Sequence, residues 1–290
     1  MRILVTGGCG KLGAWVAREL AASNSDHEVT VLDAQIRNPM DGVRYVAADI
    51  ISLHEVVSAA RDMDVVVHLA AVPRPDMASE LQTFTTNAVG TFIVHEAAYL
   101  CGVGRVVSSS SVAVLGWTYR NRDFDLDYVP VDEDHPVHPQ GAYALSKLVG
   151  EGIARSYTER SGMVTIVLRP NWIAEPEQLV RVAEQGGRAA TAYDTFTYID
   201  VRDLADAFRL AVETPLKGHH LLYTNADDSI ISEPLVDAFR RVAPSVAQLD
   251  GIEDLATLIS NERAKQTLGW VPQHSWRRMN RTGRTHGIIP

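Results

Sequence analysis

A glycine-rich turn between a short apolar run and a helical stretch constrains the fold of this chain more than any other feature. The segment Thr-Gly-Gly-Cys-Gly-Lys-Leu-Gly at 6–13 follows a strand-like run at 3–6 and opens a helical pattern at 11–22. Glycines at this spacing allow a tight turn, close approach of the backbone to a pyrophosphate and close helix–strand packing. The helix start adds free N–H groups and a positive dipole end. The pattern therefore predicts a dinucleotide site formed by Gly7, Gly10, Lys11, Leu12 and Gly13.

Strand-like and helical segments alternate over the first two-thirds of the chain. Apolar runs such as residues 65–67, Val-Val-Val, are typical of strands that are buried on both faces of a parallel sheet. We expect strands at 3–6, 28–33, 44–47, 65–70, 105–109 and 165–169, and helices at 11–22, 53–60, 86–101 and 142–160. This alternation predicts an α/β fold with a doubly wound parallel sheet, the Rossmann arrangement.

The regular alternation of strand-like and helical segments ends after Pro170. We expect one helix at 175–190, another at 201–213 and a strand at 220–224, with shorter and less regular segments between and after them. The sequence thus predicts a dinucleotide-binding domain at 1–170, with returns to its sheet at about 196–225. Residues 171–290 are expected to form a small C-terminal substrate lobe interleaved with that domain.

The charge and hydropathy of the chain exclude several classes of partner. The 290 residues carry a formal net charge of −9, which gives no electrostatic reason to bind nucleic acid or an anionic membrane. The apolar runs are strand-sized and well short of the roughly 20 residues of a membrane helix. The ten histidines show no metal-ligand spacing. We therefore expect no bound metal. Because the first strand begins almost at Met1, we also expect no signal peptide, and hence a cytoplasmic protein.

Asp33 strengthens the dinucleotide hypothesis and indicates which cofactor is bound. It ends the second expected strand, 20 residues after Gly13, where a carboxylate can accept hydrogen bonds from the adenosine ribose hydroxyls. A 2′-phosphate at this place would be repelled, so NAD is favoured and NADP is less favoured. Arg37 lies close enough to weaken this preference, and a strand-end turn residue is the plainer alternative for Asp33.

Tyr143 and Lys147 form a candidate proton-transfer pair. They stand at i and i+4 in Tyr-Ala-Leu-Ser-Lys, on one face of an expected helix. A phenol titrates near 10 in water, and a neighbouring ammonium stabilises the phenolate and lowers that pKa. The serine run 108–111 lies at the end of an expected strand, where parallel sheets place their ligands, and can supply a hydroxyl donor. A surface Tyr–Lys pair without function is the alternative.

Together these motifs resemble the extended short-chain dehydrogenases/reductases of the NAD-dependent epimerase/dehydratase family. The similarity runs from residue 1 to about residue 275. It is carried by the glycine loop at 6–13, Asp49-Ile50, His68-Leu69-Ala70-Ala71, Asn87-Ala88-Val89-Gly90-Thr91, the serines before Val-Ala-Val-Leu-Gly at 112–116, Asp132-Glu133-Asp134-His135-Pro136, Tyr143-x-x-x-Lys147 and Leu268-Gly269-Trp270-x-Pro272.

The resemblance assigns roles to individual residues. It implies hydride transfer between a carbinol carbon and the nicotinamide, with Tyr143 as acid/base and Lys147 lowering its pKa and holding the nicotinamide ribose. Counted back from Gly116, the catalytic hydroxyl falls on Ser111. The resemblance also implies a homodimer formed through the helices at 86–101 and 142–160. The remaining cofactor contacts that it implies are Asp49 and Ile50 at the adenine, Leu69, Ala70 and Ala71 beside the dinucleotide, and Asn87 as a polar contact near it.

Two positions depart from the pattern of family members that act on nucleotide sugars. Those members carry Arg-x-x-Asn after the sixth strand; aligned on Arg169, the Asn position here is Trp172, although Asn171 is adjacent. They also place an arginine two residues before the tyrosine that is Tyr198 here, and this chain has Phe196. An aromatic ring cannot pair with a diphosphate. We therefore expect a small non-nucleotide substrate, a sugar or sugar acid, as in the uronate and other sugar dehydrogenases that this short lobe resembles.

Several interpretations stay open. Arg181 or Arg188 could supply the missing arginine, and Arg74 could either anchor a substrate carboxylate or be a solvated loop residue. The insert 117–128 could shape specificity or only cover the sheet edge. The leading hypothesis is an NAD-dependent sugar dehydrogenase. The alternatives are a nucleotide-sugar epimerase or dehydratase with tightly bound NAD, and a dinucleotide-sensing regulator without catalysis.

Overall fold

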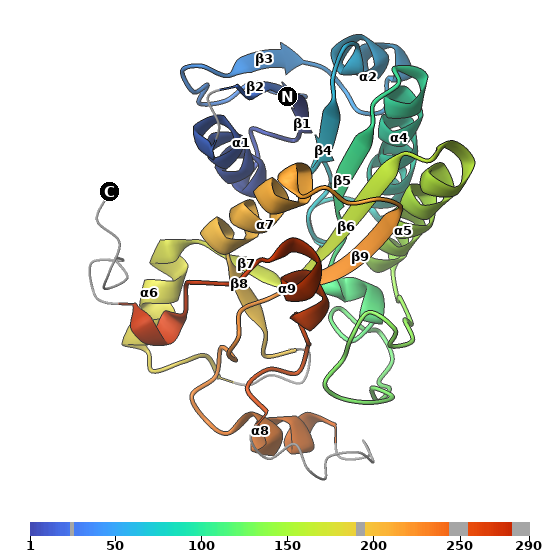
Figure 1. Cartoon of the computed structure of the whole chain (residues 1–290). Helices are drawn as coiled ribbons and strands as arrows, with labels where there is room; N and C mark the ends of the chain where they lie inside the picture. Colours follow the sequence, from blue (N-terminus) through green and yellow to red (C-terminus); the bar gives the residue numbers. More distant parts are fainter. Residues whose placement is uncertain (24–25, 190–194, 244–254, 280–290) are drawn as a thin grey trace.

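A seven-stranded parallel sheet lies at the centre of the molecule (Figure 1). The computed structural model describes residues 1–23, 26–189, 195–243 and 255–279. The strand order is β3-β2-β1-β4-β5-β6-β9, so the order reverses between β1 and β4, the point at which such sheets bind dinucleotides. The strands are β1 (Arg2–Thr6), β2 (Glu28–Asp33), β3 (Arg44–Ala47), β4 (Val65–His68), β5 (Arg105–Ser109), β6 (Val164–Pro170) and β9 (His219–Thr224).

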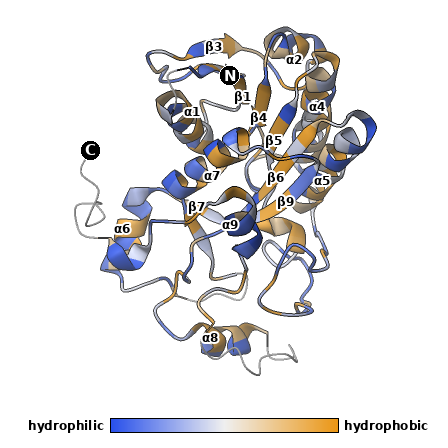
Figure 2. Cartoon of the chain, in the orientation of Figure 1, coloured by the Kyte–Doolittle hydropathy of each residue, from blue (hydrophilic) through white to orange (hydrophobic). Residues whose placement is uncertain are grey.

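Helices cover both faces of this sheet. On one face α1 (Lys11–Ser23) packs against α7 (Val201–Glu213), and on the other α2 (Leu53–Ala60), α4 (Gly90–Leu100) and α5 (Ala142–Ser161) lie side by side. Residues of β1 alternate between two cores, because Ile3 belongs to the α1–α7 cluster and Leu4 to the α2–α4 cluster. Burial on both faces explains the unbroken apolar runs in the strands (Figure 2). The predicted doubly wound fold is confirmed.

Three predicted elements have a boundary that differs from the structure by two residues or more. The helix expected at 86–101 begins earlier, as α3 (Glu80–Phe84), and passes through a π-helical turn (Thr85–Val89) into α4. That turn shifts the apolar positions out of a 3.6-residue period, which hid the first part of the helix. The strand expected at 65–70 ends at His68. The helix expected at 175–190 ends at Glu184, in α6 (Pro176–Glu184), because two consecutive glycines with positive φ follow it; residue 190 lies outside the described residues.

The segments after β6 form a smaller layer beside the sheet. Two parallel strands, β7 (Trp172–Ala174) and β8 (Tyr198–Asp200), pair with each other, and α6 packs against the 3₁₀ turn Trp276–Arg278. Two further helices follow, α8 (Leu235–Val242) and α9 (Glu262–Leu268). We call β7, β8, α6, α8 and the 3₁₀ turn the C-terminal lobe. Between them the chain returns to the main sheet as β9, beside β6.

The described ranges lack two features that would indicate other classes of protein. No helix there combines the length and the apolar content that crossing a bilayer requires. The same ranges hold no group of three or more His, Cys, Asp or Glu side chains placed to bind a metal ion.

Candidate active site

The residues proposed from the sequence gather at the carboxyl ends of the strands. In the register of the sheet, Thr6 stands beside Leu32 and His68, and His68 beside Ser108. The glycine loop, Asp33, the segment 69–71 and the serine run follow these positions directly. Parallel strands bring their carboxyl ends to one edge of the sheet, so residues far apart in sequence share one site there.

The glycine loop is shaped by close backbone contacts. The Gly7 amide donates to the Leu32 carbonyl at 2.7 Å, and Gly7 has a φ of 73°, which favours glycine. A Cβ at Gly7 would lie 2.6 Å from the Ala70 nitrogen, and a Cβ at Gly13 would overlap the Gly7 carbonyl. Gly10 is exposed, and a Cβ there would meet only the Gly7 oxygen at 3.2 Å. This cradle of exposed backbone at the start of α1 fits a pyrophosphate.

Asp33 and Lys11 lie on either side of this loop. The Asp33 carboxylate accepts the Cys9 amide at 3.0 Å and the Gln35 amide at 3.2 Å, so it is fixed at the end of β2, where a ribose would lie. The Lys11 ammonium donates to the Ile173 carbonyl at 2.8 Å and therefore connects the loop to the C-terminal lobe. The donor and acceptor set at this end of the sheet suits NAD. The neighbouring Leu12 packs its side chain partly into the α1–α7 core.

The residues expected around the dinucleotide have different surroundings. Asp49 is exposed, and its side chain accepts the Ile51 amide at 3.0 Å. Ile50 is buried against α4, where a Cβ at Gly90 would lie 2.6 Å from the Ile50 Cδ1 atom. The residues Leu69, Ala70 and Ala71 are partly buried after β4.

Asn87 is a positioning residue in this structure. Its amide oxygen accepts the Val72 N–H at 2.7 Å, and its amide nitrogen donates to the Val72 carbonyl at 3.1 Å and to the Ser146 hydroxyl at 3.2 Å. Ser146 in turn donates to the Tyr143 carbonyl at 2.7 Å. Asn87 lies in the π-helical turn, so this turn aims a buried amide at both the β4 loop and the helix that carries Tyr143.

Tyr143 and Ser111 lie together at the first turn of α5 and the end of β5. Burial raises the pKa of Tyr143 to about 12, and a hydrogen bond with Ser111 acts in the opposite direction. The Ser111 Oγ also accepts the Ala113 amide at 3.1 Å, which caps the 3₁₀ turn Val112–Leu115 and fixes the hydroxyl. Two of the three residues proposed for catalysis are therefore joined directly.

Lys147 lies one turn further along α5. Its ammonium donates to the Ser109 carbonyl at 3.0 Å and lies 6.0 Å from the centre of the Tyr143 ring. Burial lowers the pKa of Lys147 to about 8, although Glu151 opposes the shift. We expected Lys147 to lower the Tyr143 pKa; the structure gives that effect to Ser111 and aims the ammonium at the β5 backbone.

His68, to which the sequence argument assigned no role, connects two elements that frame the site. Its Nδ1 lies 2.8 Å from the Thr6 hydroxyl and its Nε2 3.0 Å from the Thr91 hydroxyl. Thr91 donates its own proton to the Asn87 carbonyl at 2.6 Å, so it accepts from Nε2–H. Burial lowers the pKa of His68 well below its usual range, which agrees with a neutral ring. His68 thus ties β1, which leads into the glycine loop, to α4.

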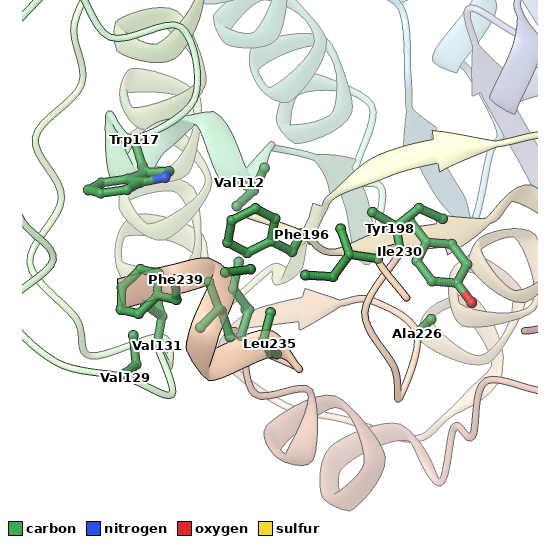
Figure 3. Close-up of a cluster of buried hydrophobic side chains, with 14 of the residues drawn as sticks. Val112, Trp117, Val129, Val131, Phe196, Tyr198, Ala226, Ile230, Leu235 and Phe239 are labelled. Carbon is green, nitrogen blue, oxygen red and sulfur yellow. The ribbon is translucent and has the colours of Figure 1, made fainter. Parts of the chain in front are cut away.

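The positions that depart from the nucleotide-sugar pattern lie in the C-terminal lobe. Phe196 is 0% exposed and packs in an apolar cluster with Val112, Ile230, Leu235 and Phe239 (Figure 3). Trp172 is partly buried, and the Arg188 guanidinium lies 5.0 Å from the centre of a Trp172 ring. Arg181, the other arginine that could replace the one absent at Phe196, is exposed on α6. Asn171 is buried and accepts a hydrogen bond from Thr197.

The fold and site together define an NAD-dependent enzyme of the oxidoreductase type, with a glycine-rich turn at the switch point and a Ser–Tyr–Lys group beside it. Comparison with known families agrees, because the sequence model of the NAD dependent epimerase/dehydratase family matches residues 3–223. The chain belongs to this family. The predicted membership and the predicted use of NAD are confirmed.

Individual relatives cover most of the chain. An L-arabinose 1-dehydrogenase (NAD(P)(+)) of Haloferax volcanii is 30% identical over 239 residues, which is 80% of this chain and 91% of that protein. A UDP-glucose 4-epimerase of Corynebacterium glutamicum is 29% identical over 317 residues, which cover 95% of this chain and 92% of that protein. A solved short-chain dehydrogenase/reductase superfamily protein from Agrobacterium tumefaciens with bound NAD has a TM-score of 0.72 at 25% identity, covering 96% of this chain and 94% of that one.

Proposed function

We propose that the chain is an NAD-dependent dehydrogenase or reductase of a small, non-nucleotide sugar or sugar acid. The observation that carries this proposal is the fully buried, apolar surroundings of Phe196. Family members with nucleotide-sugar substrates are expected to hold an arginine there. An arginine in this cluster would place a guanidinium among apolar side chains, which is strongly unfavourable without a paired charge. The cluster therefore favours a substrate without a diphosphate.

The lengths of the matched relatives support the same choice. The match to the epimerase extends over 317 positions, more than the 290 residues of this chain, so the epimerase has insertions that this chain lacks. The match to the L-arabinose dehydrogenase extends over only 239. A shorter chain has less protein with which to enclose a nucleotide. The epimerase is still 29% identical, so a nucleotide-sugar epimerase is the second candidate.

The proposed chemistry assigns one task to each of three side chains. Oxidation of a carbinol releases a hydride and a proton, and NAD, when bound, supplies the hydride acceptor. Tyr143 takes the hydroxyl proton, and in the reverse direction returns it. Ser111, held by the Ala113 amide, orients the reacting oxygen. The Lys147 ammonium, 6.0 Å from the centre of the Tyr143 ring, would hold the nicotinamide ribose of bound NAD, while the Ser111 hydrogen bond lowers the Tyr143 pKa.

Absorbance of NADH separates the candidate functions. We expect steady NADH production when the purified chain is given NAD and a free aldose or uronate, and a loss of about a thousandfold or more in Tyr143→Phe. Tyr99→Phe, on an exposed tyrosine near the end of α4, is the matched control. Turnover of a UDP-sugar without net NADH would replace this proposal with an epimerase. Binding of NAD without turnover of any sugar would support the third candidate, a dinucleotide-sensing regulator without catalysis.

A homodimer and a cytoplasmic location also stay proposals. Several large apolar side chains are exposed on the neighbouring helices α4 and α5, which the family resemblance places at a dimer interface. They are Phe92, Tyr99, Leu100, Leu145 and Val149.

A further inference from the structure

The insert 117–128 places an aromatic ring against the proposed acid/base. The Tyr119 and Tyr143 rings lie 6.2 Å apart, centre to centre, and meet edge to face at 89°. Tyr143 is 8% exposed and Tyr119 is 48% exposed. Tyr119 therefore stands between solvent and the reacting group, at the mouth of the site. The sequence left open whether the insert does more than cover the sheet edge.

The backbone of the insert is held in one conformation. Tyr119 has a φ of 64°, a strained value for an aromatic residue, which persists only where the surroundings fix it. The neighbouring Arg120 is buried, donates to Asp123 at 2.9 Å and to the Trp117 carbonyl at 3.1 Å, and stacks over the Trp117 ring at 4.2 Å.

Gln140 anchors the other side of the insert. Its amide oxygen accepts the Asn121 amide at 3.0 Å and the Arg122 amide at 2.9 Å, and its amide nitrogen donates to the Arg122 carbonyl at 3.0 Å. Gln140 is only three residues before Tyr143. The insert is thus attached to the segment that leads directly into α5, which keeps Tyr119 facing Tyr143.

A charged pair lies in the loop after β4, at the edge of the sheet that carries the site. Arg74, in the loop after β4, pairs with Asp76 at 2.9 Å, and both side chains are exposed. Burial raises the pKa of Tyr119; Asp76 raises it further and Arg74 lowers it. Because Asp76 offsets the Arg74 charge, this rim presents hydrogen-bond donors and acceptors with no net charge.

We propose that Tyr119 is a specificity-determining residue that forms the wall of the sugar pocket opposite the catalytic centre, and that the Arg74–Asp76 pair beside it selects a neutral sugar over a sugar acid. An aromatic wall packs against the C–H face of a sugar ring, and an Arg–Asp pair exchanges hydrogen bonds with hydroxyls. A carboxylate at the same place would find the Arg74 guanidinium already paired with Asp76 and would gain no ion pair of its own. This inference rests on the proposed dehydrogenase function and narrows its substrate class.

The first test changes the wall. Tyr119→Gly removes the ring and suits a φ of 64°, so the insert is retained. We expect a fall of about tenfold or more in kcat/KM for D-galactose, equivalent to about 1.4 kcal/mol of transition-state stabilisation. Tyr119→Phe keeps the ring and should stay within about threefold of the unchanged protein. Arg122→Ala is the matched control, since Arg122 is exposed in the same insert and contacts Gln140 through its backbone.

The second test changes the charge of the rim. D-Galactose and D-galacturonate have the same stereochemistry and differ in the oxidation of C6, so their kcat/KM ratio reports recognition of a carboxylate. We expect galactose to be preferred, Asp76→Asn to shift the ratio toward galacturonate by about fivefold, and Arg74→Gln to shift it the other way.

Each outcome decides one claim. A preference for galacturonate in the unchanged protein, or an unchanged ratio in Asp76→Asn, would overturn the selection of neutral sugars. Unchanged kcat/KM in a folded Tyr119→Gly, with an unchanged melting temperature, would overturn the role of Tyr119. In these cases NADH is still produced, so the proposed function stands. Failure of every free sugar to yield NADH would overturn the proposed function, and this inference with it.

Discussion

The hydroxyl of Ser110 donates a hydrogen bond of 2.6 Å to Glu151, which connects the end of β5 to the middle of α5. Glu151 also pairs with Arg169 through two bonds of 2.7 and 2.8 Å, and all three side chains are buried. Ser110 lies between Ser109, whose carbonyl accepts from Lys147, and Ser111. The Glu151–Arg169 pair therefore positions both sides of the catalytic centre without belonging to it.

We predict that weakening this connection lowers turnover more than substrate binding. Ser110→Ala removes one hydrogen bond and leaves the ion pair, so it should lower kcat about tenfold with little change in KM. Glu151→Gln leaves Arg169 buried beside a neutral partner and should also destabilise the fold by about 3 kcal/mol. Steady-state kinetics and denaturant unfolding measure the two effects.

The pH dependence separates positioning from a merely structural role for Glu151. The carboxylate opposes the lowering of the Lys147 pKa, so Glu151→Gln should move that pKa further below about 8, and Ser110→Ala should move it less. Glu159→Gln, exposed on the same helix, is the control and should leave the kinetic pKa unchanged. A pH profile that does not move in Glu151→Gln would contradict the electrostatic part of this prediction.

Lys147 should destabilise the folded protein at neutral pH. Its pKa is about 8 in the fold and about 10.5 when unfolded, so the unfolded chain binds more protons between these values. Stability from this group therefore rises as pH increases from 8 to 10.5, and below 8 the penalty of burying the ammonium is complete. Lys147→Met should be inactive yet gain stability relative to the unchanged protein at pH 7, and lose most of that gain by pH 10. An equal difference at both pH values in urea unfolding would refute the buried-charge argument.

The sequence predicted the sheet well because its strands carry a local signal. The apolar runs in β1, β4 and β5 are too short for helices, and the strand order follows from the connection rules of α/β folds. The same reasoning failed where a backbone feature breaks the period. The π-helical turn at Thr85–Val89 has no composition of its own, and Gly186 and Gly187 end α6 before the expected boundary.

The candidate site likewise contains residues that the sequence could identify and residues that it could not. Gly7, Asp33, Tyr143 and Lys147 stand in motifs whose spacing carries the chemistry. Tertiary contacts are different, because Tyr119 meets Tyr143 from 24 positions away in the sequence, and no spacing rule connects an insert to a helix. The bonds of His68 to Thr6 and Thr91 likewise exist only after the sheet and α4 have packed.

Asp33 should set the preference between the two dinucleotides. Its carboxylate is fixed by the Cys9 amide at 3.0 Å, so a 2′-phosphate would meet a charge that cannot turn away. Asp33→Ser removes the charge and keeps a hydroxyl, and we expect the ratio of kcat/KM for NADP over NAD to rise at least about tenfold. Binding measured by calorimetry should shift in the same direction. Asp41→Ser, an exposed acidic residue further along the loop, should leave the ratio unchanged. If Asp33→Ser and Asp41→Ser behave alike, Asp33 is only a turn residue.

The exposed apolar side chains of α4 and α5 make the oligomeric state testable. Phe92 is 48% exposed, and its ring lies 6.2 Å from that of the buried Tyr157 of α5, so this exposed ring lies where the two helices meet. In a symmetric dimer each change is introduced twice into the same interface, and a buried carboxylate without a partner is strongly unfavourable. We therefore expect Phe92→Glu to convert a dimer into a monomer, as measured by light scattering. Leu81→Glu on α3 should change the measured mass less. A chain that is monomeric before any change, at micromolar concentration, would refute the proposed dimer.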